Sequence, residues 1–249
     1  MKLMSKSLYF LTFFLTLSSQ IGFVKAQSYP NLKREQISQK FKPRVDNKRN
    51  PVTDGGATRG KSCLTKKELL IPLTPLNLVG LTVAKHPTFF WNMPDSIAKS
   101  LNFTIFADGE TEPLYKTKLP IRNAAGIMSF TLPQNAPPLE INQTYKWSVN
   151  VICDPEDSSA NIRMSAWVER IEADTSLIQN LKNSDSRNLS NVYGEAGIWY
   201  EGLNSIIQQR CIQPNNLAVK IKWRQFLESA GLKDIISQKL INSCLVNNK

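Results

Sequence analysis

The sequence predicts an α+β fold in which an antiparallel β-sandwich is followed by a small helical lobe. Within residues 71–172, apolar side chains recur with a period of two between turn residues, which is typical of short half-buried strands. After Ala173 the apolar period becomes that of helices. Residues 68–249 hold 17 basic and 17 acidic residues, so the net charge of +11 over the 249 residues comes entirely from the segment that precedes them. The pattern therefore predicts a neutral folded part with a cationic leader.

Residues 1–26 have the features of a secretory signal segment. Two lysines precede the apolar run 8–17, and a Val-Lys-Ala sequence ends at Ala26 in the manner of a cleavage site. We expect cleavage near Ala26 and an extracytoplasmic location, periplasmic or secreted. The alternative is an uncleaved anchor helix, which Gln20 and Lys25 disfavour because they interrupt the roughly 20 apolar residues that a span needs.

Residues 27–67 form a basic arm. They hold eleven basic residues and three acids, few apolar residues and an Asp54-Gly55-Gly56 break, so we expect the arm to be disordered. Its charge suits an anionic polymer or a lipid surface. A solvated linker that keeps the protein soluble is the alternative, and nucleic acid is not an expected partner of an exported chain.

Within the sandwich domain, residues 68–172, each strand is predicted by local alternation and ends at a turn. Leu101, Phe103 and Ile105 alternate with polar residues, and Asp108-Gly109 then ends that strand. About seven short strands with regular turns favour a sandwich. The predicted strands are, in order, 78–83, 88–92, 101–105, 115–119, 127–132, 145–152 and 162–171.

The strand that starts at Tyr145 has a further feature. Tyr145, Trp147, Val149 and Val151 share one face, and Leu139 precedes the tyrosine by six residues. This pattern resembles the tyrosine corner of fibronectin type III and related immunoglobulin-like domains. The resemblance implies an immunoglobulin-like sandwich and a structural role for the tyrosine, with no activity attached.

The helical lobe, residues 173–249, is predicted as five helical stretches. Asp174 or Thr175 can cap the first, Pro214 follows the third and Gly231 stops the fourth. The stretches centre on residues 177–181, 189–196, 199–207, 223–230 and 234–241.

Part of this lobe is similar to a tetratricopeptide repeat. The residues that carry the similarity are Leu189, Tyr193, Gly197, Trp199, Gly202, Ile206 and Pro214. Gly197 would allow the turn between two helices and Gly202 their close crossing. Ser190 stands where a small residue is usual, and Gln209 departs from the expected alanine. Because such repeats normally stack in threes, we expect this lobe to dock on the sandwich.

The four cysteines predict two disulfides. None forms a CxxC pair, and an exported chain meets an oxidising compartment, where three pairings are possible. Cys211 and Cys244 both lie in the helical tail, so we favour the pairs Cys63–Cys153 and Cys211–Cys244. Four buried thiols are the alternative.

Three runs resemble a family of exported cyanobacterial proteins, the domain-of-unknown-function family nine-two-eight. They are His86-Pro87-Thr88-Phe89-Phe90-Trp91, Cys153-Asp154-Pro155 and Glu195-Ala196-Gly197-Ile198-Trp199-Tyr200. The resemblance covers roughly residues 59–235. It implies an extracytoplasmic bacterial setting and supplies no activity, ligand or catalytic residue.

The sequence shows no catalytic, cofactor-binding or metal-binding constellation, so we predict a protein that is not an enzyme and has no cofactor. His86, the single histidine, is expected to pack or to cap a turn. We interpret the acidic loop at Asp154, Glu156 and Asp157 as an ordinary turn. A weak calcium site is the alternative. A carboxylate hydrolase would need a converging pair among the following acids. These are Glu169, Glu172, Glu195 and Glu201.

Aromatic residues supply the possible binding surface, namely Phe89, Trp91, Trp199 and Tyr200. Phe90 must face away from Phe89 and Trp91, so one face of that strand needs a cover. We expect the helical lobe to cover it, and a carbohydrate- or protein-binding strip is the second interpretation. The sequence thus predicts an exported, non-enzymatic module that interacts with another envelope protein. The alternatives are a module that binds glycan or anionic polymer and a carboxylate-dependent hydrolase.

Overall fold

The computed structural model describes residues 40–44, 63–65, 69–121, 125–241 and 243–244. The predicted signal segment and cleavage point lie outside the described residues, as does most of the basic arm. Within the described residues, the order of elements is eight strands followed by four α-helices. The predicted α+β class is therefore confirmed.

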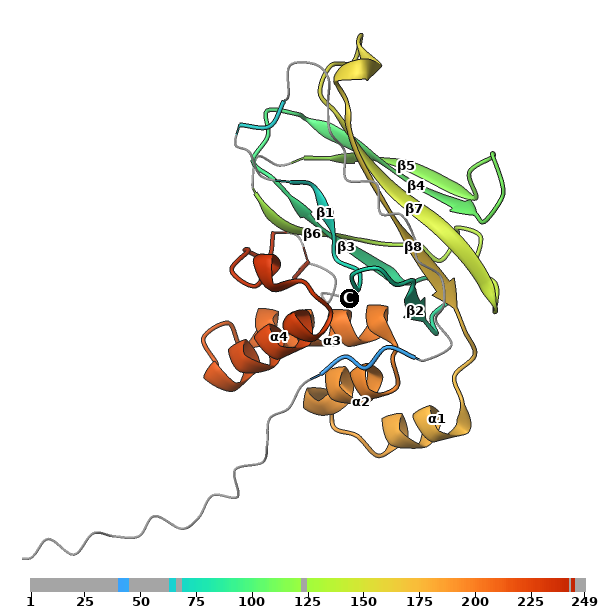
Figure 1. Ribbon diagram of the computed structural model, residues 1–249, viewed down its shortest axis with the longest axis vertical. Helices are drawn as coiled ribbons and strands as arrows, with labels where there is room; N and C mark the ends of the chain where they lie inside the picture. The colour runs from blue at the N-terminus through green and yellow to red at the C-terminus, as the bar shows by residue number, and fades with distance from the viewer. Residues whose placement is uncertain (1–39, 45–62, 66–68, 122–124, 242, 245–249) are drawn as a thin grey trace, which may run out of the picture. The chain divides into compact units, whose positions relative to one another are not determined.

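Two sheets form the sandwich (Figure 1). A three-stranded sheet has the order β1-β3-β6, and a five-stranded sheet has the order β2-β8-β7-β4-β5. All neighbouring strands are antiparallel except β2 and β8, which pair in parallel. The strands are β1 (Ile71–Pro72), β2 (Gly80–Thr82), β3 (Thr88–Met93), β4 (Ser100–Ala107), β5 (Tyr115–Pro120), β6 (Gly126–Thr131), β7 (Gln143–Ile152) and β8 (Ile162–Arg170).

Strand β7 shows how the alternating sequence builds the interior. Its inward side chains Tyr145, Trp147, Val149 and Val151 are all buried, whereas the residues between them are half-exposed. The Tyr145 hydroxyl accepts a hydrogen bond from the backbone N–H of Glu140 at 2.8 Å. The predicted tyrosine corner is thus formed, and it fixes the loop that leads into β7.

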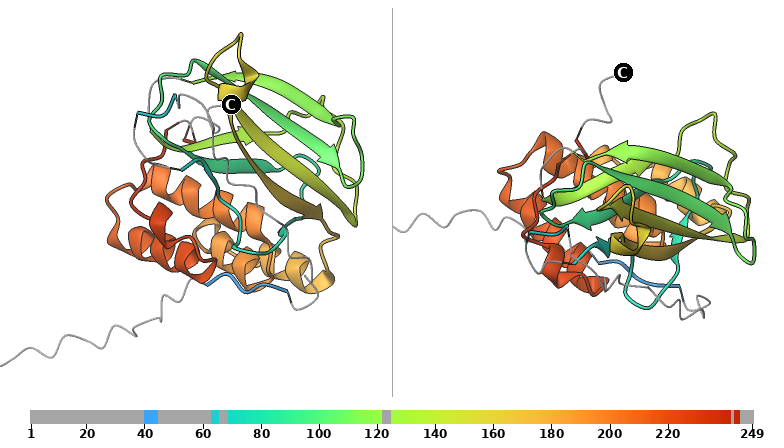
Figure 2. Two further views of the ribbon diagram at one scale, coloured as in Figure 1. Left: turned by 45° about the horizontal axis from the view of Figure 1, so that its top comes forward. Right: turned by 90° about the horizontal axis from the view of Figure 1, so that it is seen from above.

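Four helices make up the lobe, and the left view of Figure 2 shows them gathered on one side of the sandwich. Asp174 caps the first helix by accepting a hydrogen bond from the Leu177 N–H, as predicted. The elements are η1 (Ser158–Ala160), α1 (Thr175–Lys182), η2 (Ser186–Asn188), α2 (Leu189–Glu195), α3 (Trp199–Ile212), α4 (Leu217–Ser229) and η3 (Lys233–Ile235), where η marks a 3₁₀ turn.

The turn and crossing predicted at two glycines are present. Gly197 adopts a φ of +74° between α2 and α3, a conformation that glycine adopts without strain. A Cβ atom at Gly202 would lie 3.4 Å from the Tyr193 Cβ on α2 and 2.9 Å from the Phe226 ring on α4, so α3 passes close to both helices there. Gln209, which departs from the repeat pattern, donates from its side chain to the Ser190 hydroxyl at 3.4 Å.

A fifth helix over residues 234–241 was a wrong prediction. Only the short turn η3 forms, and the chain then runs along the edge strand β6. The Ile127 N–H donates to the Lys239 carbonyl, and the Ile241 N–H donates to the Ile127 carbonyl. The unpaired backbone groups of a sheet edge favour this pairing, which the apolar periodicity of the segment does not reveal.

Helix α3 closes the open side of the sandwich. Tyr200 contacts Phe89 edge-on inside the sandwich, and its hydroxyl accepts a hydrogen bond from Trp147 Nε1 at 2.9 Å. The same hydroxyl donates to the Trp167 carbonyl at 3.2 Å. Trp199, the preceding residue, donates from Nε1 to the Leu73 carbonyl at 2.8 Å. The sandwich and lobe therefore share one hydrophobic core.

Residues 40–44 differ from the expectation of an unpacked basic arm. Phe41 is only 5% exposed and contacts the rings of Trp199 and Phe226. The Lys42 N–H donates to the Gly194 carbonyl, and the Lys42 ammonium forms an ion pair with Glu195. One aromatic side chain supplies the apolar contact that the composition of the arm as a whole lacks.

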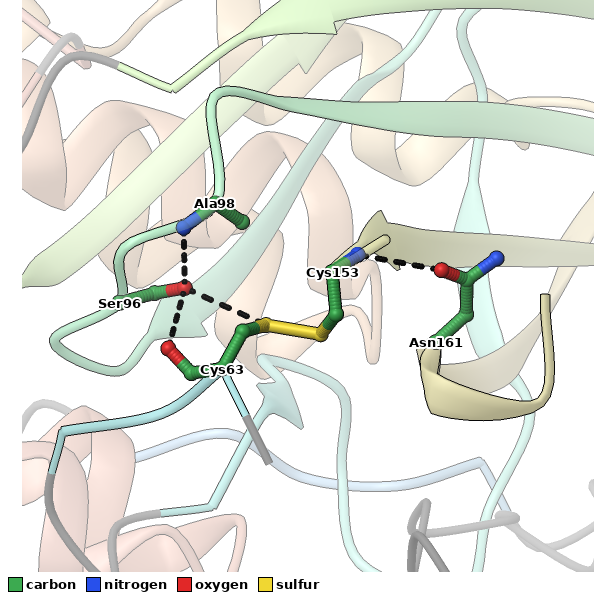
Figure 3. The surroundings of a disulfide bond; sticks show 5 residues. All are labelled: Cys63, Ser96, Ala98, Cys153 and Asn161. Carbon is green, nitrogen blue, oxygen red and sulfur yellow. Dashed lines mark hydrogen bonds between the residues drawn. A yellow bond between two sulfur atoms is a disulfide. The ribbon is translucent and has the colours of Figure 1, made fainter. Parts of the chain in front are cut away.

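Both predicted disulfides form, Cys63–Cys153 and Cys211–Cys244. Figure 3 shows the first, where the Ser96 hydroxyl donates to the Cys63 carbonyl and accepts from the Ala98 N–H. The second joins α3 to the segment that follows the β6 contact. Each disulfide thus links segments that are distant in the sequence.

Candidate functional site

The aromatic residues proposed as a binding surface offer no surface. Phe89, Trp91 and Trp199 are 0% exposed and Tyr200 is 1% exposed. Phe90, on the other side of β3, is also buried. Both faces of β3 are therefore covered, and on the interior face Tyr200 of α3 contacts Phe89.

Glu201 lies at the junction between α3 and β2. Its carboxylate accepts a hydrogen bond from the Thr82 hydroxyl at 2.5 Å, and the Val83 N–H lies 3.4 Å away. Burial raises the pKa of Glu201, while these hydrogen bonds oppose the rise. The sequence presents Glu201 only as one of four acids that could form a carboxylate pair, since helical periodicity does not report that β2 packs beside it.

The other ionisable candidates have local roles. His86 Nε2 lies 3.1 Å from the Ala136 carbonyl, so the imidazole bridges two loops as a turn-capping role predicts. Asp154 accepts from the Glu156 N–H and Asp157 from the Ser159 N–H. The acidic loop is thus a turn stabilised by side-chain to backbone bonds. Among the residues that the structure describes, no three His, Cys, Asp or Glu side chains group as metal ligands would.

Two of the acids considered for hydrolysis are engaged separately. Glu195 pairs with Lys42, whereas Glu201 contacts Thr82 on β2. These contacts give each carboxylate a structural role.

A groove of about 850 Å³ lies on the lobe between η2, α3 and α4. Helix α3 buries Trp199, Leu203 and Ile206 against the core and turns its opposite face to this groove. The residues of that face recur at helical spacing: Asn204, Ser205, Gln208, Gln209 and Ile212. The volume falls in the range of ordinary ligand sites.

Local hydrogen bonds hold the far wall of the groove. Asp185 pairs with Arg187, and this hydrogen bond lowers the pKa of Asp185 to about 2. The Lys222 ammonium donates to the Arg187 carbonyl at 3.2 Å and so ties α4 to η2. Asn216 caps α4 by accepting from the Ala218 and Val219 N–H groups. An ion pair and side-chain to backbone hydrogen bonds therefore stabilise this wall of the groove.

The groove also holds polar groups that are free to bind. Asn204 and Ser205 make no side-chain hydrogen bond within the described parts of the chain. Ile212, 74% exposed, adds an apolar contact, and Leu217 next to the groove is 70% exposed. Neutral amides carry both a donor and an acceptor, which matches the peptide bond. Sequence reasoning missed this site, although the amide-rich face of α3 was a readable signal.

Of the residues described, none belongs to a helix with the length and hydrophobicity required to span a bilayer. A search of curated proteins finds no match. Among solved structures, the chain is similar to the fn3 domain of the human collagen alpha-1(XX) chain, with 13% identity and a TM-score of 0.27. That match covers 48% of this chain and 93% of the other.

A family model described as Domain of Unknown Function (DUF928) matches residues 54–240. The match extends from the end of the basic arm through both sheets and all four helices to the segment paired with β6. It thus includes the groove and the α3 junction. The chain belongs to the DUF928 family.

Proposed function

We propose that this protein is an exported, non-enzymatic interaction module of the bacterial cell envelope, and that its groove binds an extended segment of another envelope protein. The observation that carries the proposal is the combination of unpaired amide and hydroxyl groups with exposed Ile212 on one wall. An extended polypeptide presents backbone N–H and C=O groups that can bond to the unpaired amide and hydroxyl groups. Its side chains can contact Ile212.

The two disulfides support an oxidising, extracytoplasmic setting. Such bonds form and persist outside the cytosol, where partner proteins of the envelope are found. The docking of the lobe also supports a binding role, because α3 is held rigidly by the sandwich while its other face stays accessible. A rigid groove loses little conformational entropy when it binds.

Affinity capture from an envelope extract tests the proposal. The full chain serves as bait, alongside an Ile212→Glu variant that places a charge in the groove. Ile97→Glu is the matched control, because Ile97 is 68% exposed in a loop of the sandwich and carries the same change. We expect a partner that the wild-type chain and Ile97→Glu retain and that Ile212→Glu captures at least tenfold less.

An Asn204→Ala variant separates the amide contact from the apolar one, and we expect it also to reduce capture. The proposal fails if all baits retain the same proteins, or if capture by Ile97→Glu falls as much as capture by Ile212→Glu.

A further inference from the structure

The outer face of the five-stranded sheet is independent of the groove. In strands β4, β5, β7 and β8, labelled side by side in Figure 1, alternate residues point into the sandwich and the others point away. The register of the strands aligns the outward residues in rows that cross the sheet. We call this surface, formed by the outward residues of β4, β5, β7 and β8, the cationic face.

One row consists of hydroxyl side chains. Thr104 on β4 pairs with Ser148 on β7, and Ser148 pairs with Ser165 on β8. Ser165 is only 3% exposed, yet its hydroxyl has no hydrogen-bond partner within the described chain. The Ser165 hydroxyl therefore lies beneath the surface, and the half-exposed Ser148 is the member of this row that a ligand can reach.

The next row consists of amides with a cation at each end. Asn102 pairs with Asn150, and the buried Oδ1 of Asn150 also lacks a partner in the described part of the chain. Lys118 on β5 lies beside Asn102, and Arg163 on β8 lies beside Asn150. Both cations are exposed. The row thus offers amide groups between two positive charges.

Charge on this face is strongly biased. Its outward residues include four cations, Lys116, Lys118, Lys146 and Arg163, and one acid, Glu169. The neighbouring acids lie in the hairpins beyond the strand ends, at residues 108–112 and 154–157. A ligand that lies across the strands therefore meets the cations and avoids the acids. Four strands span roughly 14 Å in that direction.

We propose that the cationic face binds an acidic polysaccharide laid across strands β5, β4, β7 and β8. Lys118 and Arg163 pair with its anionic groups, because their spacing places one charge at each edge of the amide row. The half-exposed side chains of Ser148, Asn102 and Asn150 bond to sugar hydroxyls, which require both donors and acceptors. This binding is separate from the protein interaction proposed for the groove.

The test measures binding of the full chain to alginate, with neutral dextran as the uncharged comparison, by affinity electrophoresis and calorimetry. The double variant Lys118→Glu/Arg163→Glu reverses both ends of the amide row. The matched control is Lys220→Glu/Arg224→Glu, which makes the same change in charge at two exposed positions of α4. Ser148→Leu fills the hydroxyl row without changing the charge.

We expect the sheet variant to weaken alginate binding at least tenfold, the α4 variant to change it less than twofold, and Ser148→Leu to weaken it severalfold. Equal losses for both double variants would mean attraction by net charge alone and would overturn the proposal. So would dextran binding equal to that of alginate. Phosphatidylglycerol vesicles form a third arm, and vesicle binding with the same dependence on Lys118 and Arg163 would assign the face to a membrane instead.

Discussion

At the scale of single residues, the neighbours Tyr200 and Glu201 make different contacts where α3 meets the sandwich. Tyr200 enters the sandwich interior and bonds to Trp147, whereas Glu201 lies at its edge and bonds to Thr82. The phenol is neutral and satisfied, and burial raises its pKa further. The carboxylate is the group at this junction whose charge responds to pH near neutrality or below.

The raised pKa of Glu201 predicts a specific pH dependence of stability. Since its pKa is higher in the folded state than the ordinary 4.5, the folded chain holds this proton more tightly than the unfolded chain. The stabilisation is complete below pH 4.5 and is lost as the pH rises through the folded-state pKa. Glu201→Gln should therefore gain stability relative to the wild type as the pH rises from 4.5 to 8, measured by urea unfolding.

Glu228→Gln, an exposed position on α4, controls for the loss of a surface carboxyl. If the difference between Glu201→Gln and the wild type is independent of pH, Glu201 is not perturbed by burial.

Phe41 supplies the apolar contact between residues 40–44 of the basic arm and the lobe. We predict that Phe41→Ala lowers the free energy of unfolding by roughly 3–5 kcal/mol, because a buried aromatic side chain leaves a cavity. Lys40→Ala, an exposed neighbour, should change it by less than about 0.5 kcal/mol. Equal, small effects for both variants in thermal unfolding would show that residues 40–44 do not pack in solution.

At the scale of elements, the segment after η3 completes the three-stranded sheet. Backbone bonds between Ile127 and residues 239–241 extend the edge of β6, and the disulfide Cys211–Cys244 fastens the end of this segment to α3. The edge strand is therefore covered by the chain itself, which limits pairing with other molecules.

Removal of this disulfide should loosen the β6 edge selectively. The bond closes a loop of 33 residues, for which the chain-entropy relation gives about 3–4 kcal/mol. The Cys211→Ser/Cys244→Ser variant is expected to lose this stability and to exchange the Ile127 amide hydrogen faster, while the Val149 amide at the centre of β7 keeps the highest protection. Uniform acceleration across both sheets would contradict a local role.

At the scale of the whole described structure, sandwich and lobe share one core, so we expect them to unfold together. Calorimetry should show one transition, with the calorimetric enthalpy equal to the van't Hoff enthalpy. A chain truncated after residue 172 lacks Tyr200 and the cover of Phe89, and we predict that it binds a hydrophobic dye and shows no cooperative transition. Two separate transitions in the full chain, or a truncated chain that unfolds cooperatively, would show independent domains.

Much of this architecture can be predicted from short stretches of the sequence. The alternation around Trp147, the Asp174 cap and the turn at Gly197 each depend on a few adjacent residues, and the structure contains all three. The disulfide pairing was also predictable, because Cys211 and Cys244 lie in one helical tail. These features follow from backbone geometry and from which side chains share a face.

The candidate sites depended on tertiary structure instead. Periodicity says that Phe89 and Tyr200 need burial, but it does not say that they bury each other. It marks Asn204 and Ile212 as one face of a helix, but only the positions of η2 and α4 make that face a groove. The sequence by itself determined the elements and their apolar faces, and the tertiary structure decided which faces meet, because packing joins residues that are distant along the chain and leave no local pattern.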